Sequence, residues 1–324
     1  MKSFIMSLDE SLGGLQMQEH LHFTTPLPQV QKLFHHILKE VKRVYDVVIP
    51  IEIRQRRNID LQKQQDVVII AVCILGKMLG FTSERSWHSF VKANLFHGKP
   101  FPERSRYHRC CRQLTQVIKR IRNELVQKSP EDTNYSIIDS VPLPLCRNAR
   151  IPRVRKMKDI ADRGYCASKK EYYYGLKGSF QVTAEGFVTN YVISKASTHD
   201  VKVTEELIEP YPHSYILADK GYVSLPLRDQ LKENLGVHLL AQPKSNSKRP
   251  FSKSLSKLVS SKRKQIETLF SGLIDVFHLT RIRAMSSIGF ELALECILLA
   301  HTLLVHSAIS SHGNGMRWKS LIFS

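Results

Sequence analysis

The stretch that decides how this chain folds is Tyr135-Ser-Ile-Ile-Asp139-Ser-Val-Pro142-Leu-Pro144-Leu-Cys146. Two isoleucines directly before Asp139 predict a short buried strand that carries one carboxylate. Proline has no N–H to donate to a sheet, so Pro142 and Pro144 indicate that the strand ends here or lies at an edge. Asp139 is therefore expected at a strand terminus, where α/β proteins build their sites. An Asp that bonds its own backbone in a turn is the plainer alternative.

The chain is large and strongly basic. Its 324 residues suffice for two or three domains, and the hydrophobic content of 42% is that of a globular protein. The formal charge of +19 and the pI of about 9.7 exceed what solubility needs. They favour a polyanionic partner, nucleic acid above all, over a basic surface without a specific partner.

The cysteines and the apolar stretches argue against several classes of protein. None of the six cysteines stands in Cys-x-x-Cys spacing, which speaks against a zinc site and for reduced thiols, with Cys146 and Cys166 as structural residues. The start of the chain lacks the apolar core of a signal peptide. The most apolar late stretch, residues 292–309, contains Glu295 and two histidines, so we expect a buried helix and no membrane partner. A cytoplasmic, nucleoid-associated protein is expected.

The N-terminal part is predicted to be all-α. Residues 1–25 show no clear period and are expected to be loosely ordered. Between residues 26 and 130 the apolar residues recur at helical spacing, and they predict helices over 30–48, 66–79 and 83–95.

The last predicted helix of this region is basic and runs from a cap at Ser105 to about Leu125. Three arginines lie off its apolar stripe near the helix start, namely Arg106, Arg109 and Arg112. Such a helix after a short helix and a loop is similar to the recognition element of a helix-turn-helix, whose first turns contact DNA. A solvated basic face on an ordinary bundle helix would give the same pattern.

Past a polar linker at residues 126–134 the apolar period becomes strand-like. Strands, a hairpin with Gly186 at its turn, and helices then alternate along the chain. This order predicts an α/β domain with a mixed sheet flanked by helices over residues 131–312, followed by a tail at 313–324.

Basic residues and tyrosines alternate just after the first predicted strand. Residues 147–177 hold ten basic and three acidic residues, which suits a nucleic-acid backbone. The candidate DNA contacts here are Arg153, Arg155 and Lys156. The tyrosines at 172–174 are better explained as the start of a packed strand.

A second basic stretch, residues 244–264, holds eight basic residues and no acidic one. Its composition predicts a loop that phosphate would order. A helix is predicted to follow over residues 260–277, with one apolar face.

Two more acids stand in positions similar to that of Asp139. Asp219 directly follows the apolar run Tyr215-Ile-Leu-Ala, and Glu267 follows Ile266 on a predicted helix. Three acids converging from two strands and a helix would form an oxygen-only site, which suits Mg²⁺. Two such ions can activate an attacking oxygen and stabilise a leaving one. From the residues alone, it stays open whether Asp219 only shapes a turn and Glu267 only pairs with Arg263 on the surface.

Three segments together resemble the catalytic blocks of bacterial insertion-sequence DDE transposases. They are Ile137-Ile-Asp139-Ser, Ile216-Leu-Ala-Asp219-Lys-Gly-Tyr222 and Arg263-Lys-Gln-Ile-Glu267-Thr-Leu-Phe-Ser271, and Thr198-His199-Asp200 and Arg281-Ile-Arg-Ala284 are also similar to that family. The resemblance covers roughly residues 60–310. It implies an RNase H-like catalytic domain behind an all-α DNA-binding region, two Mg²⁺ ions that Mn²⁺ can replace, and DNA transposition.

The resemblance also implies roles for individual residues. Asp139, Asp219 and Glu267 would be the catalytic, metal-binding triad. Phosphate contacts are implied for Lys220, Lys262, Arg263, Lys264 and Arg281. The family often has a Tyr three residues before the Arg and a Lys seven residues after the Glu, but Ser260 and Ile274 stand at those positions here. This departure puts the Lys-dependent part of end recognition in doubt, and leaves the metal chemistry untouched.

The function predicted from the sequence is a transposase that cleaves the ends of its element and joins the freed 3′-hydroxyl to target DNA. Its partners would be the terminal inverted repeats, the target DNA and further copies of the chain on the DNA ends. A nuclease on the same fold without strand transfer is one alternative, and a decayed or repurposed DNA-binding protein is another.

Asp200 is expected to cap a helix that begins at Val201, although a role of His199 or Asp200 in the site stays open.

Overall fold

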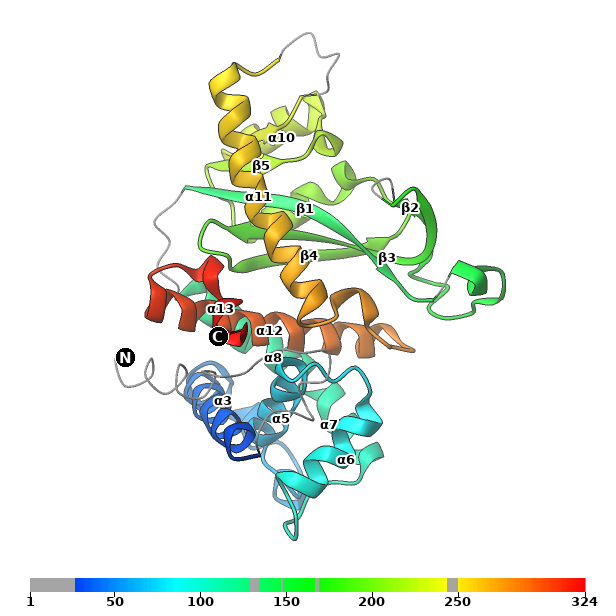
Figure 1. Ribbon diagram of the computed structural model, residues 1–324, viewed down its shortest axis with the longest axis vertical. Coiled ribbons are helices and arrows are strands. Elements are labelled where there is room, and N and C mark those ends of the chain that lie inside the picture. Colours follow the sequence, from blue (N-terminus) through cyan, green and yellow to red (C-terminus); the bar gives the residue numbers. More distant parts are fainter. Residues whose placement is uncertain (1–26, 129–133, 147, 167–168, 244–249, 324) are drawn as a thin grey trace. The chain divides into compact units, whose positions relative to one another are not determined.

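The computed structural model describes residues 27–128, 134–146, 148–166, 169–243 and 250–323 (Figure 1). The N-terminal segment expected to be loosely ordered, much of the predicted linker, and residues 244–249 of the second basic stretch lie outside these ranges. The chain divides into two compact units, one formed by residues 1–129 with 275–324 and the other by residues 130–274. They are called the helical unit and the sheet unit below.

The helical unit is built from α-helices of very different lengths. They are α3 (Leu27–Val48), α4 (Ile51–Arg54), α5 (Asp66–Met78), α6 (Glu84–Asn94), α7 (Arg104–Gln113), α8 (Thr115–Gln127), α12 (Ser287–His312) and α13 (Ser320–Phe323). The helices α3, α5 and α6 confirm the sequence predictions. Ser83 caps α6 by accepting a hydrogen bond from the Ser86 N–H at 3.3 Å.

The basic helix predicted from Ser105 to Leu125 is wrong in two respects. It consists of two helices, α7 and α8, and the residue before α7 is Glu103, so Ser105 lies inside the first turn. The break falls at Leu114, which has φ −90° and ψ 1°. There the Thr115 hydroxyl donates to the Arg112 carbonyl at 2.9 Å, which satisfies one of the carbonyls freed at the end of α7.

The helix α12 forms the centre of the helical unit, where it packs against α5 and α8. By length and composition alone it could cross a membrane, but most of it is buried inside the unit, as expected for a core helix. The segment expected to be a tail also packs here, because Trp318 stacks on Phe277 with ring centroids 5.7 Å apart. Residues 275–324 therefore belong to the helical unit, whereas the domain bounds expected from the sequence placed most of them with the sheet.

The described part of the sheet unit contains six strands, β1 (Tyr135–Pro144), β2 (Asp162–Cys166), β3 (Glu171–Thr183), β4 (Val188–Lys195), β5 (Tyr215–Ala218) and β6 (His238–Ala241). Their order is β2-β3-β1-β5-β6, and β4 pairs with the part of β3 that β2 leaves free. The pairs β1–β3, β2–β3 and β3–β4 are antiparallel, while β1–β5 and β5–β6 are parallel. This mixed sheet is the one predicted, and its strand order is consistent with the RNase H-like fold.

Helices cover both faces of this sheet. The short 3₁₀ segments Asn148–Arg153, Asp200–Val203 and Lys220–Tyr222 accompany the helices α9 (Thr204–Ile208), α10 (Leu225–Leu235) and α11 (Lys253–Asp275). On one face Ile138, Ile216 and Leu231 share a buried core. On the other face Phe270 of α11 meets Phe180 of β3 with centroids 5.6 Å apart, and Figure 1 shows α11 crossing the sheet.

Two predictions for this unit are confirmed and one is wrong. Gly186, with φ +98°, turns the hairpin between β3 and β4, and the tyrosines 172–174 lie in β3 as expected. The second basic stretch was expected to stay a loop up to residue 260, but α11 begins at Lys253. Val259, only 1% exposed, explains the earlier start, because it extends the apolar face of α11 by two turns.

Candidate active site

Asp139 does not end its strand as the prolines suggested, because β1 continues through both of them to Pro144. The Leu145 N–H donates to the Tyr174 carbonyl of β3 at 2.9 Å, so alternate residues of β1 direct their N–H toward β3. Pro142 and Pro144 fall between these residues, and the N–H that they lack would point away from β3. On that side β1 pairs with β5 only over Tyr135–Ile137, so the missing donors cost no sheet hydrogen bond.

The pairing of β1 with β5 brings the first two predicted acids together. The parallel register sets Ile137 opposite Leu217, and β5 ends one residue later at Ala218. Extended by two residues, the same register places Asp139 beside Asp219, with both side chains on one face of the sheet. Asp139 therefore lies inside its own strand, but at the point where the neighbouring strand stops.

Each of these carboxylates is held by the backbone that follows it. The Ser140 N–H donates to Oδ1 of Asp139 at 2.8 Å, and the Lys220 N–H donates to Oδ1 of Asp219 at 2.7 Å. The second bond caps the 3₁₀ segment Lys220–Tyr222. Asp219 thus does shape a turn, and this same contact fixes the direction of its carboxylate.

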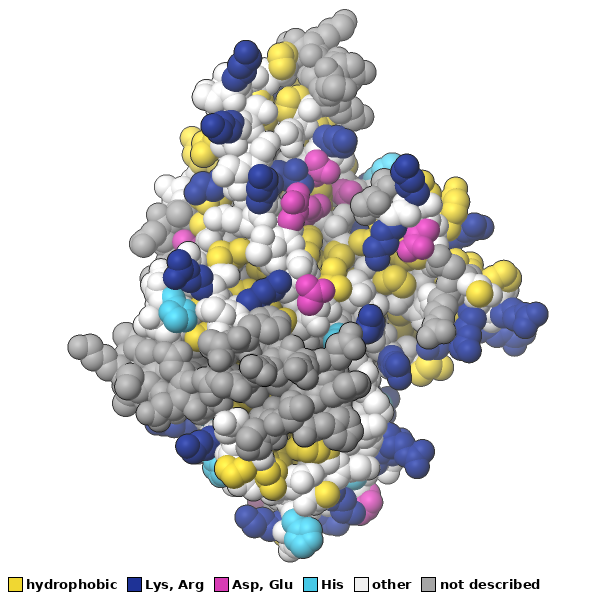
Figure 2. Space-filling model, in the orientation of Figure 1, with side chains coloured by type: hydrophobic (Ala, Val, Ile, Leu, Met, Phe, Trp, Pro, Cys, Tyr) yellow, Lys and Arg dark blue, Asp and Glu magenta, His cyan; other side chains and the backbone are white. Residues whose placement is uncertain are grey.

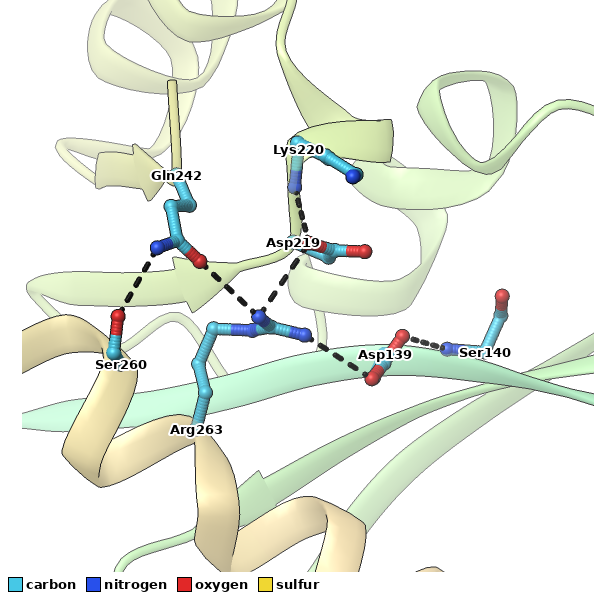
Figure 3. Close-up of polar contacts among 7 residues, drawn as sticks. All are labelled: Asp139, Ser140, Asp219, Lys220, Gln242, Ser260 and Arg263. Atoms are coloured by element: carbon cyan, nitrogen blue, oxygen red, sulfur yellow. Dashed lines mark hydrogen bonds and ion pairs between the residues drawn. The ribbon is translucent and has the colours of Figure 1, made fainter. Parts of the chain in front are cut away.

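The Arg263 guanidinium lies between the two aspartates (Figure 3). One of its terminal nitrogens is 3.4 Å from Oδ2 of Asp139, and the other is 3.4 Å from Oδ1 of Asp219. Gln242 accepts from the same guanidinium at 3.5 Å and donates to the Ser260 hydroxyl at 3.0 Å. Only 10% of the Arg263 side chain is exposed, so its charge faces the carboxylates.

The surroundings of Asp139 shift its ionisation toward neutral pH. Burial is the main reason that the pKa of Asp139 rises to about 6, and the negative charges of Asp219 and Asp200 add to this rise. The Ser140 N–H and the Arg263 guanidinium act in the opposite direction. Because burial makes the charged form of Asp139 unfavourable, an additional cation nearby would stabilise that charged form.

Asp200 is a third acid at this site, and the sequence interpretation gave it mainly a different role. It was expected to cap a helix, but the N-cap position there is occupied by His199, and the 3₁₀ segment begins with Asp200 itself. Its Oδ1 lies 3.3 Å from the Lys177 ammonium of β3. Its Oδ2 lies close to Gly221, the residue two positions after Asp219. A Cβ added to Gly221 would stand 3.5 Å from this oxygen. The Thr-His-Asp block was the sequence signal for this position.

Glu267, the third predicted ligand, lies four residues after Arg263 on α11, and so on the same side of that helix. Its side chain is exposed. Among the residues that the structure describes, no three Asp, Glu, His or Cys side chains are grouped closely enough to hold a metal ion. The oxygen-rich donor set fits a hard divalent ion, whereas the convergence of all three acids stays a prediction.

Most of the predicted DNA contacts are exposed. In the sheet unit these are Arg153, Arg155, Lys220 and Lys264, and in the helical unit Arg106, Arg109, Arg112 and Arg281. Lys156 is half-buried, and Lys262 lies 5.4 Å from the centre of the Tyr135 ring. Figure 2 shows acidic side chains exposed among Lys and Arg beside α11. Whether these residues contact DNA stays a prediction.

The mixed sheet thus sets two aspartates around one guanidinium, at the end of β5 and within the segment that the following comparison matches. Residues 130–303 match the family model described as the transposase DDE domain. The match covers more than half of the chain, so the chain belongs to this transposase family. No curated protein and no solved structure matches the chain.

Proposed function

We propose that this transposase cleaves the ends of its insertion sequence and transfers the freed 3′-hydroxyl to target DNA. Asp139, Asp219 and Glu267 would form the catalytic, metal-binding triad. The observation that carries the proposal is the register of β1 with β5, since it pairs Asp139 with Asp219 inside the segment matched by the transposase family. The family match supports nucleotidyl transfer in general, and the paired aspartates supply the residues for it.

The residues present fit a pair of Mg²⁺ ions, for which Mn²⁺ would substitute. Asp139 and Asp219 offer carboxylate oxygens side by side, and Glu267 would add a third carboxylate from α11. When bound, the ions supply positive charge to the attacking and leaving oxygens of a phosphodiester. The raised pKa of Asp139 supports this assignment, because a cation beside the buried carboxylate would offset the cost of its charge.

Arg263 would have two tasks in this site. Its guanidinium holds the two aspartates in place, with both distances at 3.4 Å. Since guanidinium matches phosphate as well as carboxylate, we propose that Arg263 turns toward a DNA phosphate once the carboxylates have another cation. The bond that the guanidinium donates to Gln242 would keep the side chain extended in either position.

The basic residues named above, most of them exposed, would hold DNA along the protein. Lys220, Lys262 and Lys264 lie next to the paired aspartates in sequence or on α11, and Arg153, Arg155 and Lys156 follow β1. In the helical unit Arg106, Arg109 and Arg112 lie on α7, and Arg281 precedes α12. Each neutralised phosphate makes binding more sensitive to salt. We further propose a cytoplasmic, nucleoid-associated protein that acts as a homo-oligomer on the terminal inverted repeats.

The test is cleavage and strand transfer on labelled duplexes that carry the element's own ends, with Mg²⁺ and with EDTA. We expect nicked and joined products with Mg²⁺ only. Asp219→Asn and Glu267→Gln should each lower the rate by about a thousandfold or more, which corresponds to about 4 kcal/mol of transition-state stabilisation. Asp229→Asn, an exposed acid on α10, is the matched control and should leave the rate unchanged.

Nicking without joined products would point to the nuclease alternative. Salt-sensitive binding without any cleavage would leave a DNA-binding protein. If Glu267→Gln were fully active while Asp219→Asn was inactive, Glu267 would not belong to the triad. Asp200 would then be the candidate for the third acid.

A further inference from the structure

The helical unit contains a cavity of about 590 Å³. Phe81 and Trp87 form part of its wall. Four basic side chains line it as well, namely Lys77, Arg112, Arg281 and Arg283, against the single carboxylate of Glu84. A cavity of this size and charge suits a small organic anion.

Three thiols from three helices meet at this cavity. Cys73 comes from α5, Cys111 from α7 and Cys296 from α12. The sulfur atoms of Cys73 and Cys111 are 3.3 Å apart, and the Tyr107 hydroxyl is 3.4 Å from the Cys73 sulfur. Cys73 is half-buried, whereas Cys111 and Cys296 are only 3% and 2% exposed.

This arrangement gives two of the thiols different tasks. Hydrogen bonds from Cys111, Cys296 and Tyr107 to the Cys73 sulfur hold the pKa of Cys73 well below its usual range, with the bond from Cys111 as the largest cause. Burial raises the pKa of Cys111. A thiolate with some access to solvent is the attacking group in disulfide exchange, and a nearby second thiol resolves the mixed disulfide.

We propose that Cys73 and Cys111 form a dithiol–disulfide pair that is oxidised by small anionic disulfides entering the cavity. The Cys73 thiolate attacks one sulfur of RS–SR, which forms the Cys73–SR bond and releases RS⁻. Cys111 then gives up its proton and attacks the Cys73 sulfur, which forms the Cys73–Cys111 bond and releases the second RS⁻. Two RSH result once both leaving groups are protonated, so the protein dithiol is oxidised and RS–SR is reduced.

The geometry requires only a small movement for the second step. A disulfide bond is about 2.05 Å long, so the sulfur atoms must approach by roughly 1.3 Å from their distance of 3.3 Å. Side-chain rotation within the cavity can supply this. The bond would tie α5 to α7, the helix that carries Arg106, Arg109 and Arg112. The inference does not depend on the function proposed for the sheet unit.

Glutathione disulfide is a suitable probe, because it is anionic and matches the basic lining. The full-length reduced chain is incubated with it and digested without reduction, and the linked peptides are identified by mass spectrometry. We expect a Cys73–Cys111 link in the wild-type chain. Cys111→Ser should instead retain glutathione on Cys73, and Cys73→Ser should give neither product.

Cys110→Ser is the matched control, because Cys110 is the neighbour of Cys111 on α7 but does not line the cavity. It should form the Cys73–Cys111 link as the wild type does. A link to Cys296 in place of Cys111, or glutathione on Cys110 as readily as on Cys73, would overturn the proposal.

A second measurement needs no variant and so does not depend on how a variant folds. The native wild-type chain is exposed briefly to iodoacetamide, and the modified cysteines are quantified. Cys73 should react at least about tenfold faster than Cys110, and the difference should vanish in urea. Equal rates in the native chain would contradict the reactive thiolate on which the proposal rests.

Discussion

Each of the two units contains a buried arginine that pairs with carboxylate, and the two arrangements differ in how many carboxylates share the arginine and how close they lie. In the helical unit Arg122 donates to Glu295 at 2.8 Å, and the two side chains are 1% and 0% exposed. In the sheet unit Arg263 is shared by Asp139 and Asp219 at 3.4 Å from each, and the aspartates are 22% and 40% exposed. The first pair is short and fully buried. In the second, one guanidinium is shared by two carboxylates at longer distances, and solvent reaches the carboxylates.

The difference separates a structural ion pair from a functional one. A buried pair with short bonds leaves no charge available to a ligand, and removing one partner exposes the full desolvation cost of the other. At the site of Asp139 two carboxylates share one guanidinium, and burial still raises the pKa of Asp139 to about 6. Such an excess of negative charge costs stability, and it is what a bound cation would offset.

The strongest test of this contrast removes Glu295. Glu295→Ala leaves the Arg122 guanidinium buried with less compensation, and we expect a loss of about 3–5 kcal/mol in the free energy of unfolding. Urea unfolding followed by tryptophan fluorescence measures it, because Trp87 and Trp318 are the two tryptophans of the chain and both lie in the helical unit.

The double variant Arg122→Met with Glu295→Leu is the control for this test. It removes both charges, so it should recover most of the lost stability. A loss below about 1 kcal/mol for Glu295→Ala alone would show that the buried pair is no more structural than a surface one.

Asp139→Asn should change the free energy of unfolding in the opposite direction from Glu295→Ala, so that the variant is more stable than the wild type at high pH. The folded-state pKa of Asp139, about 6, lies above its ordinary value of 3.8. The carboxyl therefore contributes its full stability below pH 4 and loses it as the pH rises through 6. Asp139→Asn does not ionise, so it should be more stable than the wild type at pH 8, by roughly 3 kcal/mol at most, and equal to it near pH 4.

Amide hydrogen exchange of β1 and β5 at pH 5 to 8 measures this difference within the sheet unit. Asp229→Asn, at a 57% exposed acid on α10, should show no such trend. If Asp139→Asn were less stable than the wild type at pH 8, Asp139 would be a structural residue like Glu295. Addition of Mg²⁺ should stabilise the wild type at pH 8 but leave Asp139→Asn unchanged.

The smallest effect is expected for Arg263→Gln. Both ion pairs of Arg263 are long and partly solvated, so their loss should cost about 1 kcal/mol or less at pH 8. The pKa of Asp139 should rise further, because a charge that lowers it is gone. Lys264→Gln, on the exposed side of α11, is the control, and the same exchange experiment compares the two variants. A loss as large as that of Glu295→Ala would mean that Arg263 is a structural anchor.

Sequence periodicity could predict most of the elements, because apolar residues at helical or alternating spacing have few ways to be buried. The helices α3 and α5 and the strand β5 agree with the prediction for this reason. The break at Leu114 could not be predicted, since the apolar stripe passes through it without interruption. The early start of α11 was missed because Lys and Ser dominate its first turns.

The candidate site was predictable in its two aspartates but not in its geometry. Motif order indicated Asp139 and Asp219, yet the direction of the N–H groups along β1 depends on the register with β3, which no local signal reveals. Gln242 and Lys177 were missed for a similar reason. Their partners, Arg263 and Asp200, are distant in sequence, and an isolated Gln or Lys carries no motif.

The two prolines of β1 have a further consequence, for self-association. Beyond Ile137 the side of β1 that faces away from β3 has no partner strand among the residues that the structure describes, and an unpaired strand edge is a template for the backbone of another chain. Pro142 and Pro144 have no N–H on that side, and the Ser140 N–H already donates to Asp139, so a second copy of the chain finds few backbone donors there. The residues that let β1 run past β5, and so leave Asp139 open, also protect this edge from aggregation.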